Sequence, residues 1–74
     1  MSTMYVVSKR GDTELRWDPS DAKAVAKARA AFAGYRKDKY LAFAGPDPTG
    51  AHEIVDEFDP SAGEIVLTRP LIGG

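Results

Sequence analysis

The chain contains no cysteine, so it can form no disulfide, thiolate metal site or thiol nucleophile. It has a single histidine, and the sequence offers no nucleophile–base pair and no cluster of metal-ligating residues. We therefore expect no bound metal or cofactor and no enzymatic activity of its own. The absence of thiols is also compatible with a cytoplasmic protein.

Long apolar runs and an excess of one charge are also missing. No run approaches the ~18 residues of a membrane span, and the N-terminus lacks the apolar segment of a signal peptide. Ten basic and eleven acidic residues leave a net charge of −1, which argues against nucleic acid or acidic membranes as main partners. The 74 residues predict one domain, residues 1–74, whose folding hides about 60% of the unfolded chain's surface.

The N-terminal residues predict a β-hairpin. Residues 4–8 are β-formers, and residues 13–17 alternate polar and apolar, which places Leu15 and Trp17 on one face. The turn between these runs contains Gly11, a residue that is free to adopt a positive φ.

A helix is expected next. Asp18 can cap it, with Pro19 in the first helical position, and good helix formers continue to about Arg36. Its apolar residues recur at spacings of three and four, which gives one core-facing stripe of Ala22, Val25, Ala28, Phe32 and Tyr35.

Three further strands are predicted, at residues 40–44, 52–58 and 64–68, with turn-rich segments at 45–50 and 59–63. In the second of these strands Ile54 and Phe58 should share one face, and His52 at the loop edge is expected to be solvated. One helix over one sheet is a two-layer α+β domain. Its expected core consists of Trp17, Val25, Phe32, Phe43 and Leu67.

The element order, at this length, resembles the β-grasp fold of ubiquitin and its relatives, with one helix packed on a single mixed sheet of four to five strands. This resemblance implies that the first and last strands lie side by side at the centre of the sheet. It also implies a projecting C-terminal tail at about residues 69–74.

The end of the chain carries the most specific motif. Pro70 has no N–H and ends the last strand, and the chain closes with Gly73-Gly74. A carboxylate on such a stem is sterically bare, so it can thread a narrow channel and present its carbonyl carbon for activation.

Residues 62–74 resemble the end of the small, sulfur-carrying subunit of molybdopterin synthase. In that family an acidic turn enters an apolar last strand, and a proline-containing break precedes an apolar residue and the terminal Gly-Gly. The positions that match are Glu64, Pro70, Leu71, Gly73 and Gly74, whereas Arg69 replaces the usual second proline. The thiamine-pathway sulfur carrier and bacterial ubiquitin-like modifiers also end in Gly-Gly on this fold.

The resemblance implies that Gly74 is activated by an adenylating enzyme and that Gly73 provides clearance. A thiocarboxylate then forms on a sulfur carrier, or a thioester and finally an isopeptide bond on a modifier. The implied partners are the activating enzyme, a downstream transfer or acceptor protein and, for a modifier, a JAB-type isopeptidase. The candidate partner-binding tail consists of Arg69, Pro70, Leu71 and Ile72.

Two alternatives stay open at this point. Leu71 and Ile72 can instead pack back onto the sheet. The whole chain can also be a small β-grasp binding or structural module, such as one of phage origin, in which the Gly-Gly end is incidental.

Overall fold

The computed structural model describes residues 1–8, 11–47 and 49–69, and the side chains of Ser8 and Gly11 are not described. The predictions for Pro70, Leu71, Ile72, Gly73 and Gly74 therefore lie outside the described residues. The elements are, in chain order, β1 (Ser2–Ser8), β2 (Gly11–Trp17), α1 (Ala22–Lys37), β3 (Leu41–Gly45), β4 (Glu53–Val55) and β5 (Glu64–Thr68).

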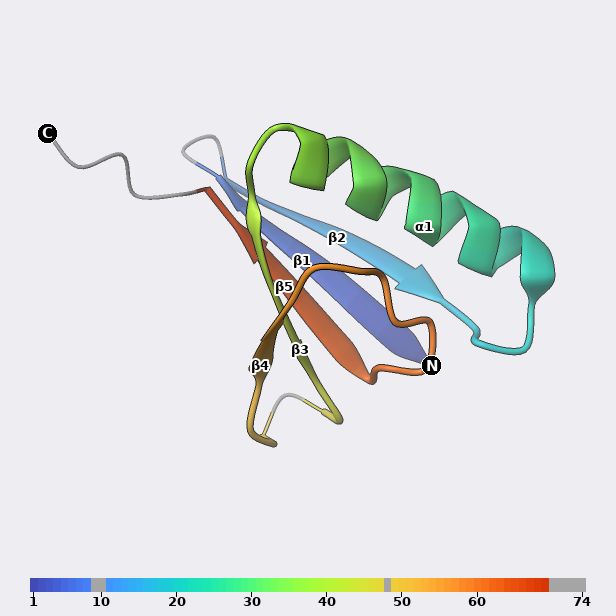
Figure 1. Cartoon of the computed structure of the whole chain (residues 1–74). Helices are drawn as coiled ribbons and strands as arrows, with labels where there is room; N and C mark the ends of the chain where they lie inside the picture. Colours follow the sequence, from blue (N-terminus) through green and yellow to red (C-terminus); the bar gives the residue numbers. More distant parts are fainter. Residues whose placement is uncertain (9–10, 48, 70–74) are drawn as a thin grey trace, which may run out of the picture.

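The strands form one mixed sheet in the order β2-β1-β5-β3-β4. β1 is antiparallel to β2 and parallel to β5, whereas β3 is antiparallel to both β5 and β4. Figure 1 shows α1 lying across one face of this sheet. The prediction of a two-layer α+β domain is confirmed, and so is the central position of the last strand beside the first.

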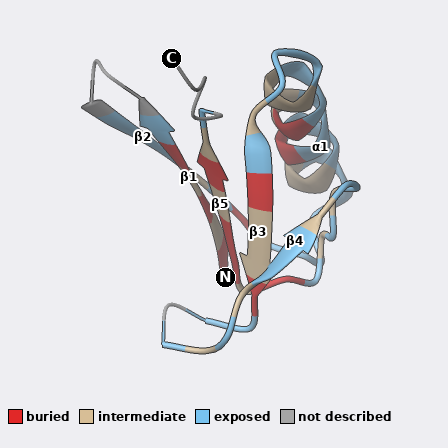
Figure 2. Ribbon diagram, turned by 60° about the vertical axis from the view of Figure 1, so that its left-hand side comes forward, coloured by how far each residue is buried: buried red, intermediate tan, exposed pale blue. Residues whose placement is uncertain are grey.

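The core lies between α1 and the sheet, and Figure 2 shows buried residues both in α1 and in the strands β1, β3 and β5. The indole N–H of Trp17 donates to the Pro60 carbonyl at 3.1 Å. The Phe58 ring lies 5.3 Å from the Trp17 ring and 5.7 Å from the Phe32 ring, at tilted angles that aromatic pairs favour. The buried apolar residues are Met4, Val6, Trp17, Ala28, Phe32, Ala42, Ala62, Ile65 and Leu67.

Four of the five predicted core residues are confirmed, because Trp17, Phe32 and Leu67 are buried and Val25 packs against them. The prediction for Phe43 is wrong. Ala42 is the strand partner of Leu67 and is fully buried, so the alternation of side chains along β3 places Phe43 on the opposite face.

The helix begins three residues later than predicted. Asp21 is the N-cap, and its carboxylate accepts hydrogen bonds from the backbone N–H groups of Lys23 and Ala24. Asp18 instead accepts from Ser20 in a separate turn before the helix. The predicted cap at Asp18 and the predicted helical position of Pro19 are therefore wrong.

Within the predicted helix stripe, Ala28 and Phe32 are buried, and Val25 and Tyr35 pack against the core. Ala22 is exposed, so its assignment to the stripe is wrong. Within the described ranges, no helix has the length and apolarity that crossing a bilayer requires.

The fourth strand is shorter than predicted, since β4 comprises only Glu53–Val55. Ile54 is 68% exposed, whereas Phe58 packs against Trp17 and Phe32 on the helix side of the sheet. The prediction that Ile54 and Phe58 share one face is wrong, because the chain leaves the sheet after Val55.

The helix ends in a Schellman motif. The Lys39 N–H donates to the Arg36 carbonyl at 2.9 Å, and Lys39 has a φ of 69°. The Tyr40 N–H donates to the Tyr35 carbonyl at 3.0 Å, and the two tyrosine rings lie 5.1 Å apart. Lys39 thus occupies the left-handed position at which glycine is usually found.

Lys39→Gly should raise the free energy of unfolding by about 1 kcal/mol, because glycine adopts this φ without the steric cost of a Cβ. The same change at Lys27, an exposed position in the helix interior, should lower it by about 1 kcal/mol. Urea unfolding of the two variants checks both values. A loss of stability for Lys39→Gly would contradict the motif.

Candidate functional site

The face of the sheet opposite α1 carries a continuous group of apolar side chains. The strand register aligns Tyr5, Val66, Phe43 and Ile54 in one row across β1, β5, β3 and β4. The next row contains Val7 and Leu41, on either side of Thr68. We call the apolar members the open-face patch: Tyr5, Val7, Leu41, Phe43, Ile54 and Val66.

The open-face patch is accessible to a partner. Ile54, Val7 and Leu41 are 68%, 43% and 40% exposed, and Tyr5, Phe43 and Val66 are half-buried. Contiguous apolar surface of this kind usually marks an interaction site on a small protein. The side chains of the patch are apolar apart from the Tyr5 hydroxyl group, a composition typical of a docking surface.

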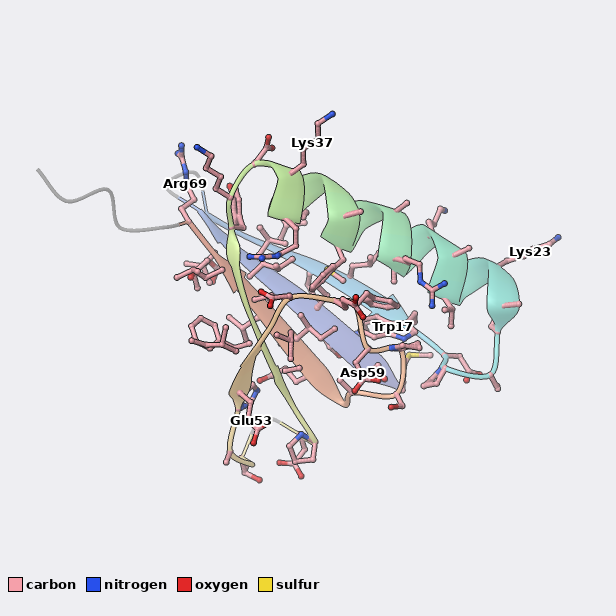
Figure 3. All side chains as sticks on the ribbon, viewed as in Figure 1. Trp17, Lys23, Lys37, Glu53, Asp59 and Arg69 are labelled. Carbon is pink, nitrogen blue, oxygen red and sulfur yellow. The ribbon has the colours of Figure 1, made fainter. Side chains whose placement is uncertain are left out.

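The open-face patch extends to the end of β5. Thr68 is the last residue of this strand and pairs with Val7 and Leu41. Arg69 follows this strand and is exposed. Figure 3 shows Arg69 at the same end of the molecule as Lys37, the last residue of α1.

At the opposite end of this face, His52 fastens the loop between β3 and β4 to the sheet. Its Nε2 lies 2.8 Å from a carboxylate oxygen of Glu64, and its Nδ1 lies 2.9 Å from the Gly50 carbonyl. A Cβ at Gly45 would lie 2.7 Å from the ring, so glycine is needed there for close packing. The prediction that His52 is solvated is wrong.

The two nitrogens of the His52 ring thus each have a polar partner, the Gly50 carbonyl and the Glu64 carboxylate. Glu64 is only 8% exposed, and this contact provides its side chain with a partner. No sequence pattern indicated the pair, because the two residues lie twelve positions apart and the fold brings them together.

Three turns of the same kind lie at this end of the sheet. Asp18, Asp47 and Asp59 each begin an Asp-Pro-Ser or Asp-Pro-Thr tripeptide, a repeat that the sequence reading missed. Each carboxylate accepts from both the backbone N–H and the hydroxyl group two residues on, at 2.6–2.9 Å. The Asx turns at Asp18 and Asp47 follow β2 and β3, and the one at Asp59 precedes β5. The three turns therefore determine the path of the connections at that end of the sheet.

The hydrogen bonds in these turns hold the pKa of Asp18, Asp47 and Asp59 below the ordinary value of 3.8. For Asp18 the backbone N–H of the serine is the largest cause, and for the other two it is the hydroxyl group. A carboxyl whose pKa is lower in the folded state stabilises the fold above its unfolded pKa, and this stabilisation is lost as the pH falls through the folded pKa.

We therefore expect the melting temperature to be insensitive to these groups near neutral pH and to fall below about pH 4. Replacing all three aspartates by asparagine keeps the side-chain acceptor and removes the titration, so the acid-induced fall should be smaller. Thermal unfolding followed across the acid range compares the two proteins. An identical acid dependence would contradict a role for the three turns.

A groove of about 650 Å³ lies between α1 and the segment after β4. Arg36 donates to the Tyr40 carbonyl and pairs with Asp56 at 3.2 Å, and the Arg29 guanidinium lies 5.8 Å from the centre of the Phe58 ring. The side chains of this groove include both cations and carboxylates, and they already contact one another. The groove therefore has no preference for an anionic or a cationic ligand. Among the described residues, no group of three or more metal-ligating side chains is arranged to hold an ion.

Comparison with known proteins finds no matching family model, no matching curated protein and no matching solved structure. A functional assignment therefore depends on the sequence motif at the end of the chain and on the geometry of the described residues.

Proposed function

We propose that the protein is a β-grasp carrier or modifier that is activated at the carboxylate of Gly74. The strand order and the single helix on one face support the β-grasp assignment. The observation that carries the functional proposal is the position of β5. This central strand leads through a short segment to Gly73-Gly74, and the open-face patch lies beside its end.

The proposed chemistry begins with a partner enzyme that binds ATP. The Gly74 carboxylate attacks the α-phosphorus, and pyrophosphate leaves as the acyl-adenylate forms. A sulfur nucleophile supplied by the partner then attacks the carbonyl carbon and AMP leaves. This chain supplies the acyl group, its bare glycine stem and the docking surface, and the catalytic residues belong to the partner. A reaction that consumes ATP agrees with the cytoplasmic location proposed for the protein.

In this proposal the open-face patch holds the domain against the activating enzyme while the tail enters the active site. Arg69, Pro70, Leu71 and Ile72 connect the patch to the glycines and are the proposed tail contacts. Aromatic side chains near the centre of an interface often contribute most to binding, and Tyr5 and Phe43 lie in the central row.

The test is activation in an extract of the native host supplied with ATP. The double variant Leu41→Ala/Ile54→Ala should lower the rate at which Gly74 is activated by about tenfold or more, because both side chains are exposed members of the patch. Its melting temperature should change little. Lys37→Ala, on the exposed face of α1, is the control and should retain the full rate. Equal rates for the unaltered protein, the double variant and the control would contradict a docking role for the open-face patch.

A second candidate is a β-grasp binding or structural module whose Gly-Gly end is incidental. The open-face patch favours this candidate as well, because a binding surface needs no reactive terminus. The two candidates differ in one observable property, namely whether Gly74 is ever found in a modified form.

A further inference from the structure

The groove between α1 and the segment after β4 has two walls of opposite charge. Figure 2 shows the chain turning toward α1 after β4, and this turn creates the second wall. The α1 wall contains the cations Arg29, Arg36 and Lys37, and the facing wall contains the carboxylates Asp56 and Glu57. Because the two signs lie on separate walls, the groove matches a partner that carries both charges, one on each side.

The floor between the two walls is apolar. Phe32, Ala33 and Phe58 provide it, and of these Phe32 is buried, Phe58 is half-buried and Ala33 is exposed. Because the side chain of Ala33 ends at its Cβ, a larger apolar side chain of a partner can lie beside it. An apolar floor with a few charged groups at its margins, in a volume of about 650 Å³, is typical of a binding site.

The contact that spans the groove is easily replaced. Arg36 donates to the Tyr40 carbonyl, which holds its guanidinium in place, and it pairs with Asp56 at 3.2 Å. The Asp56 side chain is 89% exposed, and ion pairs in such surroundings contribute little to stability. Among the described residues, Arg29 and Lys37 form no ion pair, so their charges are available to a partner.

The backbone of both walls favours a helical partner. The N–H and C=O groups in the middle of α1 bond within the helix. On the facing wall, β4 ends at Val55, so residues 56–58 belong to none of the strands. An extended peptide would find no ladder here for its own backbone groups, whereas a helix satisfies its backbone internally.

We propose that this groove binds an amphipathic helix of another protein. The apolar stripe of that helix would cover Ala33 and Phe58. Its acidic flank would face α1, and its basic flank would face Asp56 and Glu57. The stretch of α1 from residue 29 to residue 37 is about 12 Å long at 1.5 Å per residue, so about two turns of the partner helix would make contact.

A second copy of this chain does not fit the same description. Within the described ranges α1 is the one helix, and it contains no acidic residue between Ala22 and Lys37, so it has no acidic flank to offer. The inference does not depend on activation at Gly74. The open-face patch lies on the opposite face of the sheet, and neither the patch nor the tail takes part in it.

The experiment uses the full chain and a capped synthetic helix of about 18 residues, in which a stripe of Leu separates a flank of Glu from a flank of Lys. Fluorescence anisotropy gives the dissociation constant, and amide NMR locates the site. We expect saturable binding, with the largest amide shifts in the second half of α1 and in residues 56–58. The double variant Asp56→Lys/Glu57→Lys should weaken binding by about tenfold. Lys27→Glu, on α1 but outside the groove, should leave it unchanged.

Two altered peptides separate this mode of binding from general attraction. A peptide with Glu on both flanks should bind the unaltered protein about tenfold more weakly than the two-charge peptide, and it should bind the double variant more tightly than it binds the unaltered protein. A proline in the middle of the two-charge peptide breaks its helix and should abolish binding.

The proposal is overturned if either altered peptide binds the unaltered protein as tightly as the two-charge peptide does. It is equally overturned if the amide shifts are confined to β2 or the open-face patch, or if no binding is seen at millimolar peptide. Amide shifts in the groove that depend on protein concentration without any peptide would identify a second copy as the occupant, which also contradicts the proposal.

Discussion

Phe32→Ala is expected to lower the free energy of unfolding by about 3–5 kcal/mol, enough to unfold much of the protein. Phe32 is only 3% exposed and lies in tilted contact with Phe58, so its removal leaves a cavity between α1 and the sheet. A domain of this size has a total stability of only several kcal/mol. Denaturant unfolding and circular dichroism measure the loss.

Phe43→Ala is the matched control, because it deletes the same side chain from the open face. Phe43 is half-buried and does not belong to the core cluster between α1 and the sheet, so we expect a loss of about 1 kcal/mol. Equal losses for the two variants would contradict the placement of Phe32 and Phe43 on opposite sides of the sheet. An unaltered melting curve for Phe32→Ala would show that the helix stripe is misassigned.

Deletion of Gly73 and Gly74 should abolish ATP-dependent acyl transfer while leaving the melting temperature almost unchanged. Among the described residues the buried apolar core runs from Met4 to Leu67, and a projecting tail is expected to bury little surface. Replacing both glycines by alanine is a companion variant that keeps the length of the tail and adds two methyl groups. It should retain stability and lose most of the transfer, because the stem is no longer bare.

A strong loss of stability in the truncated protein would contradict this expectation. It would mean that the end of the chain packs onto the domain, as in the alternative in which Leu71 and Ile72 return to the sheet. The carrier proposal would then lose its structural basis, since a packed terminus is not free to enter a partner's active site.

The order of elements could be predicted because each signal is local. Alternation in residues 13–17 places Leu15 and Trp17 on the core side, and the Ala-rich segment is helical. The exact start of the helix is harder to predict, because Asp18 and Asp21 are both competent caps. Ser20 binds the first and leaves the second to cap the helix.

The open-face patch could not be predicted because β3 is apolar throughout. A run such as Leu41-Ala42-Phe43-Ala44 gives no alternation, and side-chain size favoured Phe43 as the buried residue. The register with β5 decides otherwise, since Ala42 lies opposite Leu67. The motif at the chain end was read directly from the sequence, but its residues beyond Arg69 lie outside the described part.

The central claim is that Gly74 is activated, and intact mass spectrometry of the chain isolated from its native host tests it most directly. A mass gain equal to sulfur replacing oxygen would identify a thiocarboxylate and hence a sulfur carrier. Gly-Gly remnants on host lysines, present with this chain and absent after deletion of Gly73 and Gly74, would identify a modifier. We expect one of these two forms. Recovery of only the unmodified chain, from cells that express the neighbouring genes, would contradict activation and favour the binding module.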